Sequence, residues 1–140
     1  MARDFRTADE IFPKEVALRT FVHATESEEK VLRALSSLVD PRGYRSSRLK
    51  GHFGNPIQLI ELRLRDERVR QLCERLRSLP EEDLELGKKR EGNVLYVRFD
   101  KQEACQGRLK VSEGSDVIHV KLVFPDEQKA REFVERLRGS

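Results

Sequence analysis

Alternation of apolar and polar residues predicts six extended segments along the chain. Successive side chains of a strand point to opposite faces of a sheet, so a period of two predicts a strand with one buried face. The clearest case is Asp-Val-Ile-His-Val-Lys-Leu-Val-Phe at 116–124, in which apolar residues recur at every second position. The same reading, supported by β-branched and aromatic residues, predicts strands at 16–25, 44–50, 57–65, 94–100 and 107–112.

Three other segments have the period of an amphipathic helix. Thr25 and Glu28 have the spacing of a capping box, which predicts the start of a first helix, and Asp-Pro-Arg-Gly at 40–43 ends it. A second helix follows the 57–65 strand, and a third begins near Asp126. The apolar stripes are Val31, Leu32, Leu35, Leu38 and Val39 in the first, Val69, Leu72, Cys73, Leu76 and Leu79 in the second, and Ala130, Phe133, Val134 and Leu137 in the third.

The predicted order is β-α-β-β-α-β-β-β-α, which is typical of an α+β fold. Strands that come in runs pair mostly with antiparallel neighbours, and few helices can cover only one face of the sheet. We therefore expect a two-layer sandwich with three helices on one face of a mostly antiparallel sheet, a mixed sheet being the alternative. Residues 15–140 form the single predicted domain, after a flexible N-terminal arm at 1–14, and 80–93 is a charged connection.

Composition excludes some classes of protein. Charged residues make up 38% of the 140 residues, against 37% hydrophobic residues, a charge load that also occurs in heat-stable proteins. No apolar run is long enough to span a bilayer, and the first residues resemble neither a signal nor a transit peptide, so we expect a cytoplasmic protein. Cys73 and Cys105 are too widely spaced for a zinc site and are expected to be free thiols. No cofactor or metal is expected.

Basic residues are distributed unevenly. Between Arg42 and Arg77 there are ten Lys/Arg and four Asp/Glu, a local charge of +6 in a chain whose formal net charge is +3. Arginine dominates, and its planar guanidinium binds phosphate through two hydrogen bonds and stacks on bases. The asymmetry favours an anionic partner.

The face of the sheet that the helices leave open is predicted to mix cations with aromatic rings. Strand alternation places these side chains together: Arg19, Phe21, His23, Arg63, Tyr96, Arg98, His119 and Lys121. Such a mixture suits a platform that holds phosphates and stacks bases. An ordinary polar outer face and a homodimer interface are the two alternatives.

The segment Lys-Gly-His-Phe-Gly-Asn-Pro at 50–56 contains a Gly-x-x-Gly. One RNA-binding module clamps the nucleic-acid backbone with this pattern, but there it joins two helices, whereas here it lies between two predicted strands. Glycine and asparagine tolerate unusual backbone angles and proline restricts the residue before it, so the local reading is a tight turn.

Four blocks of the sequence, taken in order, carry a family resemblance. They are FVHATESEEKVLRAL, GHFGNPIQLIELRL, VLYVRFDKQEACQG and DVIHVKLVF, within a similarity that runs from about Val16 to Leu137. The chain resembles the archaeal family of small proteins described as predicted RNA-binding proteins or exosome subunits. The resemblance implies a two-layer α/β fold similar to that of the ribosomal protein that binds 5S ribosomal RNA. It also implies RNA and the RNA-degradation machinery as partners.

The resemblance also bears on particular residues. It implies a structured turn that presents Lys50, His52 and Phe53 beside Arg45 and Arg48, and a second turn in which Lys101 is exposed while Asp100 caps backbone amides. With the open face, the candidate RNA-binding residues are Arg19, Phe21, Arg45, Arg48, Lys50, His52, Phe53, Arg63, Tyr96, Arg98, Lys101 and Lys121.

A catalytic role is not expected. A nuclease needs clustered carboxylates for metal ions or a pair of imidazoles, and Glu81, Glu82, Asp83 and Glu85 lie in a connection. His23 and His119 can meet on the open face, but no nucleophile or orienting acid is near them in the pattern. We expect a non-catalytic RNA-binding protein linked to RNA processing or degradation. The alternative is a protein-interaction scaffold or homodimer that does not contact RNA.

Overall fold

One antiparallel sheet of six strands organises the chain. The computed structural model describes residues 11–50, 56–80 and 89–139. In spatial order the strands are β2 (Arg45–Lys50), β3 (Pro56–Leu64), β1 (Glu15–Val22), β6 (Val117–Val123), β5 (Val94–Asp100) and β4 (Lys89–Glu91), and every neighbouring pair is antiparallel. The described helices are α2 (Glu28–Ser36), α3 (Arg68–Arg77), α5 (Lys101–Cys105) and α6 (Glu127–Gly139).

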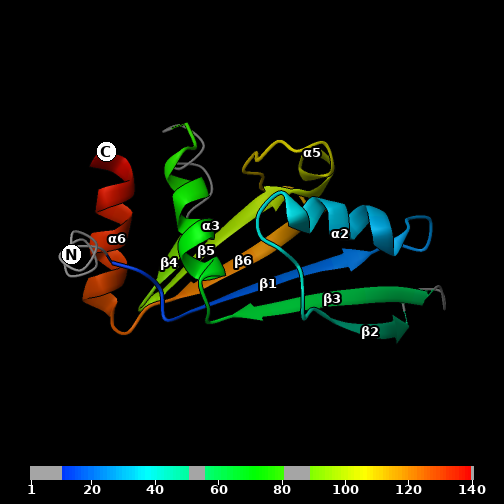
Figure 1. Ribbon diagram of the computed structural model, residues 1–140, viewed down its shortest axis with the longest axis horizontal. Coiled ribbons are helices and arrows are strands. Elements are labelled where there is room, and N and C mark those ends of the chain that lie inside the picture. The colour runs from blue at the N-terminus through cyan, green and yellow to red at the C-terminus, as the bar shows by residue number, and fades with distance from the viewer. Residues whose placement is uncertain (1–10, 51–55, 81–88, 140) are drawn as a thin grey trace.

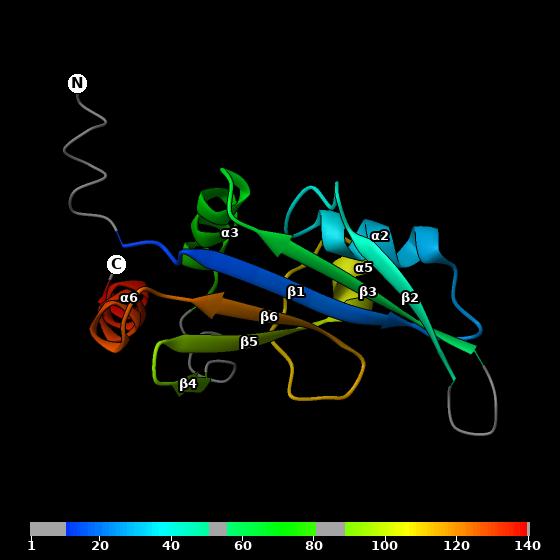
Figure 2. The same ribbon diagram turned by 90° about the horizontal axis from the view of Figure 1, so that it is seen from below.

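The helices lie on the same side of the sheet (Figure 1). Viewed from below, the strands lie in front of α2 and α5 (Figure 2). Burial follows this arrangement, because in β1 the side chains of Val16, Leu18, Thr20 and Val22 are buried while the intervening ones are not. The sheet therefore has one face in the core and one open face, as the alternation predicts.

The α+β class and the antiparallel sheet are confirmed, but two predicted elements differ. The segment 107–112 is not a strand, and only Val111 forms an isolated bridge, to Phe99 of β5. The strand that does pair with the outer edge of β5 is β4, which lies in the predicted connection. A short fourth helix, α5, follows β5 directly where a turn was expected. Three residues of β4 and five of α5 are too few to show a period.

Short polar side chains cap three of the four described helices, but the first cap is not Thr25. Ser27 caps α2, its Oγ accepting from Lys30 N at 3.1 Å. Asp100 caps α5 through Glu103 N at 2.9 Å, and Asp126 caps α6 through Lys129 N at 2.8 Å. The capping-box prediction at Thr25 is wrong by two residues, and Glu26, which lies between Thr25 and Ser27, contacts Lys101 as described below.

Some of the arginines in the basic stretch between Arg42 and Arg77 have a structural role. Arg75 Nη1 donates to the carbonyl of Ser37 at 2.6 Å, just after the C-terminus of α2, where backbone acceptors are left without helical partners. Arg68 pairs with Asp66 at 3.0 Å and donates to the carbonyls of Asp40 and Arg42. These arginines hold the α2–β2 connection against α3.

The cap assignment is testable. Ser27→Ala removes the Oγ acceptor and is expected to lower the free energy of unfolding by about 1 kcal/mol. Thr25→Ala is expected to change the free energy of unfolding by less than about 0.5 kcal/mol. If Thr25 were the cap, its replacement would be as costly as that of Ser27. Urea unfolding followed by circular dichroism measures both, and equal losses would contradict the observed cap.

Candidate nucleic-acid interface

A row of charged side chains crosses the open face from one strand to the next. Directly opposed residues of antiparallel strands project from the same face with Cβ atoms about 5 Å apart. Arg45 lies opposite Glu61, Glu61 opposite Arg19, Arg19 opposite His119, and His119 opposite Arg98. We call these five residues, which come from β2, β3, β1, β6 and β5, the central row.

A second row lies next to it, two residues along each strand. It contains Arg63, Ala17, Lys121, Tyr96 and Lys89 in spatial order. Ala17 leaves the middle of this row low, because a single methyl group stands between two long basic side chains. The two rows line a hollow of about 890 Å³, to which Glu91 and Glu113 also contribute.

The lining of this hollow is basic overall, with six Lys/Arg, three Glu and His119. Arg63 is engaged, since its Nε lies 3.5 Å from Glu15, which also binds Arg65 at 2.7 Å. The hydrogen bond from Arg65 is the main cause that lowers the pKa of Glu15. In the described part of the chain no ion pair is found for Arg19, Arg45 or Arg98, so their guanidiniums are available to an anion.

His119 lies between two of these arginines. Partial burial first, and then the charges of Arg19 and Arg98, lower the pKa of its imidazole below the ordinary value of 6.5. The ring is therefore neutral at pH 7 and can donate one hydrogen bond and accept another. A bound anion would relieve the repulsion that keeps this ring neutral.

Beyond Arg19 the open face becomes apolar. Phe21 lies opposite Leu59, and Leu49 lies opposite Ile57. Phe21, Leu59 and Ile57 are half-buried, and Leu49 is 43% exposed. The predicted mixture of cations and aromatic or aliphatic groups is thus present, but as two zones: the charged hollow and an apolar end.

The structure brings most of the predicted open-face residues together. Arg19, Arg45, Arg63, Tyr96, Arg98 and Lys121 line the hollow, and Phe21 lies on the same face. Arg48 does not, because it lies opposite Gln58, whose side chain binds Glu28 of α2 on the helical side. Arg45 and Arg48 therefore lie on opposite faces of β2, and the RNA contact expected of each stays a prediction. His52, Phe53 and the side chain of Lys50 lie outside the described residues.

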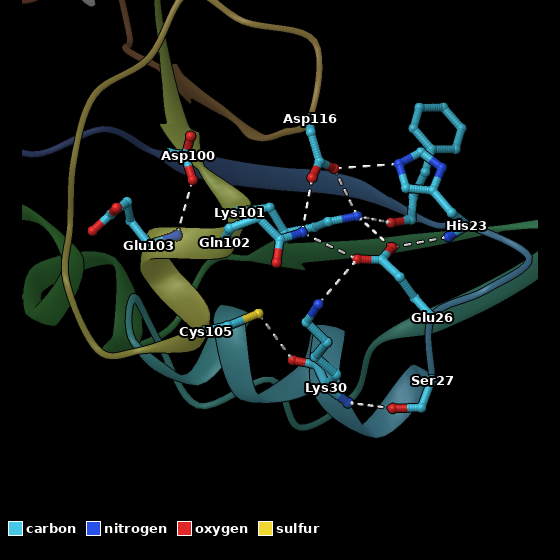
Figure 3. Close-up of polar contacts among 11 residues, drawn as sticks. His23, Glu26, Ser27, Lys30, Asp100, Lys101, Gln102, Glu103, Cys105 and Asp116 are labelled. Carbon is cyan, nitrogen blue, oxygen red and sulfur yellow. Dashed lines mark hydrogen bonds and ion pairs between the residues drawn. The ribbon is translucent and has the colours of Figure 1, made fainter.

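Lys101 is not exposed, contrary to the prediction. Its side chain is 1% exposed, and Nζ is shared among three oxygens (Figure 3). These are Glu26 Oε1 at 2.7 Å, Asp116 Oδ1 at 2.9 Å and the carbonyl of Phe21 at 2.8 Å. An ammonium group has three N–H bonds, so its donors are used within the protein. Sequence reasoning missed this because three residues far apart in the chain create the site.

The two carboxylates around Lys101 are held ionised. Desolvation alone would raise the pKa of Glu26, but hydrogen bonds from Lys101 and from His23 N outweigh it and the net shift is downward. Desolvation would also raise the pKa of Asp116, but hydrogen bonds from Gln102 and Lys101 outweigh it, so this pKa is lowered as well. The group joins the end of β1, the start of α5 and the approach to β6, which is a structural role.

We call Lys101, Glu26 and Asp116 the ion cluster. His23 contacts this cluster and does not line the hollow. Its Nε2 lies 3.3 Å from Asp116 Oδ1, past the end of β1, whereas His119 lies in the central row. Four residues of extended chain separate His23 from Arg19, roughly 13 Å. The possibility of an imidazole pair on the open face is not realised by these contacts.

Thiols and metal ligands add little to this site. Burial raises the pKa of Cys73 to about 12 and also raises that of Cys105, and both are free. Within residues 11–50, 56–80 and 89–139, no three His, Cys, Asp or Glu side chains gather in a way that could hold a metal ion. No helix in those same ranges is long and apolar enough to cross a membrane.

A family model described as RNA binding matches residues 15–124, which include every strand and three of the helices of the described fold. The chain belongs to this RNA-binding family. An RNA-binding protein of Pyrococcus abyssi is 39% identical over 142 aligned positions, covering 86% of this chain and 92% of that protein.

Two solved structures from archaea are also similar. A DUF54 protein of Archaeoglobus fulgidus has 34% identity and a TM-score of 0.69, covering 89% of this chain and 99% of its own. A DUF54 protein of Methanothermobacter thermautotrophicus has 26% identity and a TM-score of 0.72, covering 91% and 96%. The expected RNA-binding and archaeal relationship is therefore confirmed.

Several residues that line the hollow are not among the candidates predicted from the sequence. Alternation along 57–65 places Glu61 on the same face as Arg63, but its position between Arg45 and Arg19 depends on the strand register. Lys89 and Glu91 lie in the predicted connection at 80–93, and Glu113 lies between the predicted strands 107–112 and 116–124. Ala17 gave no signal, since its contribution is the absence of bulk.

Removing the buried ammonium should destabilise the fold. Lys101→Met keeps the apolar stem but leaves Glu26 and Asp116 without their shared partner, and should cost about 3 kcal/mol, because breaking a buried pair strands its charge. Lys129→Met, at an exposed site on α6, should change stability by less than about 0.5 kcal/mol. Urea unfolding measures both.

The cost of Lys101→Met should depend on pH. Carboxylates with lowered pKa values stabilise the fold above their ordinary values of 4.5 and 3.8, and this contribution is lost as pH falls through the folded values. The difference from the wild type should therefore shrink below about pH 4. A cost that is small at pH 7, or unchanged by acid, would contradict the ion cluster's role.

The pKa of His119 reports on the central row. Arg98→Gln removes one neighbouring charge and should raise this pKa toward 6.5, while Arg131→Gln on α6 should leave it unchanged. Because a base with a lowered pKa binds its proton more weakly in the folded state, acidification below pH 6.5 destabilises the wild type, and less so the Arg98 variant. NMR titration of the imidazole measures the shift. An unmoved pKa in both Arg19→Gln and Arg98→Gln would show that the three side chains do not interact.

Proposed function

We propose that this protein binds RNA through the open face of its sheet, without catalysing a reaction. The observation that carries the proposal is the central row: Arg19, Arg45 and Arg98 project from one face of a rigid sheet with no ion pair to another described residue. Unpaired arginines lose no internal contact when they bind phosphate, and guanidiniums bind phosphate through paired hydrogen bonds.

The apolar end of the face supports RNA over an ordinary polar exterior. Phe21 offers a ring for base stacking two residues from Arg19, about 7 Å along the strand. A strand that crosses the face can therefore place phosphates over the hollow while a base reaches Phe21. The family relationship points to the same ligand class.

A link to RNA processing or degradation, through association with the exosome, is part of the proposal. It rests on the family resemblance described above, as does the fold similarity to the ribosomal protein that binds 5S ribosomal RNA. A cytoplasmic location is proposed with it. Co-purification of the tagged protein with exosome subunits, before and after ribonuclease treatment, would separate a direct protein contact from one bridged by RNA.

RNA affinity should depend on salt and on the open-face arginines. Three phosphate contacts on a single strand give a slope of about −2 in a plot of log K against log salt, and Arg19→Gln or Arg98→Gln should each reduce its magnitude by about 0.7. Fluorescence anisotropy of a labelled single-stranded RNA measures this slope.

Two matched controls define the face. Arg131→Gln, exposed on α6, should leave binding unchanged. Arg48→Gln tests the edge of the sheet that the sequence also suggested. If Arg48→Gln alone weakens binding, the contact lies on the helical side of that edge. If RNA does not bind even at low salt, the scaffold or homodimer interpretation replaces the proposal.

A further inference from the structure

The cations of the hollow are not arranged as a continuous track. In the central row Glu61 separates Arg45 from Arg19, and in the lining Glu91 and Glu113 add two more carboxylates. A phosphodiester backbone that ran the whole length of the hollow would bring phosphates close to these acids. Like charges so placed oppose binding, so the lining disfavours an evenly spaced row of phosphates.

The position around His119 differs from the rest of the hollow, because its two cross-strand neighbours are both arginines. Arg19 and Arg98 are the two direct cross-strand neighbours of His119, so three nitrogen-bearing side chains stand side by side on β1, β6 and β5 with no acid between them. Neighbouring strands are about 4.8 Å apart, so the two arginine backbones are roughly 10 Å apart and their long side chains can converge above the imidazole. This arrangement fits one phosphate group.

A terminal phosphate uses this position more fully than an internal one. A phosphomonoester carries a charge of about −1.5 to −2 at pH 7 and three acceptor oxygens, whereas each internal diester has a single charge and two free oxygens. Two guanidiniums and one imidazole N–H supply donors for all three oxygens.

The surroundings suit the nucleotide that would carry this group. Tyr96 lies in the neighbouring row, two residues along β5 from Arg98, and its half-buried ring lines the same hollow. Bases stack on such rings. The volume of about 890 Å³ falls within the roughly 300–1,000 Å³ of small-ligand pockets.

We propose that Arg19, His119 and Arg98 seat the terminal phosphomonoester of an RNA strand, so that the protein prefers a phosphorylated RNA end to an interior segment. This proposal rests on the proposed RNA binding and names which part of the RNA occupies the hollow. The same chemistry occurs in a free mononucleotide, which the experiment separates from an RNA end.

The test compares one single-stranded RNA sequence in three forms: with a 5′-phosphate, with a 3′-phosphate, and with hydroxyl groups at both ends. Anisotropy competition at one salt concentration gives their relative affinities. A phosphorylated form should bind about tenfold or more tightly than the hydroxyl form. Adenosine monophosphate, as the mononucleotide probe, should compete more weakly than the phosphorylated RNA, because it lacks the rest of the strand.

Single substitutions test whether Arg19 and Arg98 cause the preference for a phosphorylated end. Arg19→Gln and Arg98→Gln should abolish the difference between phosphorylated and hydroxyl ends, whereas Arg45→Gln, beyond Glu61, should lower affinity for both forms and keep their ratio. Arg131→Gln should change neither. The His119 imidazole resonances should shift on addition of phosphorylated RNA and move little with the hydroxyl form.

The outcomes distinguish this proposal from the proposed function. Equal affinity for all three RNA forms, lowered alike by Arg19→Gln, would overturn the end preference and leave RNA binding intact. A preference that survives both Arg19→Gln and Arg98→Gln would place the phosphate elsewhere and overturn the assignment. Adenosine monophosphate binding as tightly as phosphorylated RNA would make the ligand a mononucleotide and overturn both proposals.

Discussion

The pairing register of the antiparallel sheet is the constraint on which the candidate site depends. Successive side chains of a strand point to opposite faces of the sheet. A slip of one residue in the pairing of two strands would therefore exchange the core and open-face residues of the strand that slipped. The apolar residues that pack beneath the helices, such as Leu18, Leu62 and Val120, fix that register. Fixing it for the core also aligns Glu61, Arg19 and His119 across the open face. Core packing and the charged row are therefore two consequences of one pairing.

The ion cluster around Lys101 supports the same alignment from one end. It joins the carbonyl of Phe21 at the end of β1 to Asp116, the residue before β6. Burying an ammonium is costly, and three oxygen acceptors at 2.7–2.9 Å offset that cost. A lysine that the sequence predicted to be a surface ligand is thus part of the scaffold.

The fold was largely predictable from local pattern, and the site only in part. Strands such as 116–124 are strongly periodic, and alternation alone places Arg19, Arg98 and His119 on one face. Their contact depends on which strands are neighbours: β1 lies between β3 and β6, and β6 lies beside β5. This is a tertiary fact that no local pattern contains. The same limit explains the misplacement of Lys101, whose partners are remote in sequence. The segment 107–112 does pair with the edge of β5, but only through a single bridge: Asp100 N donates to the carbonyl of Lys110 and Ser112 N to that of Arg98, on either side of Val111.

The most direct test of the account is an NMR titration that follows the arginine Nε–Hε resonances as single-stranded RNA is added. These signals report on each guanidinium separately. We expect the signals of Arg19 and Arg98 to shift early and together, while those of Arg131 on α6 and Arg33 on α2 do not move. Shifts confined to arginines of the helical side, with Arg19 and Arg98 unchanged at saturation, would show that the open face of the sheet is not the RNA-binding surface.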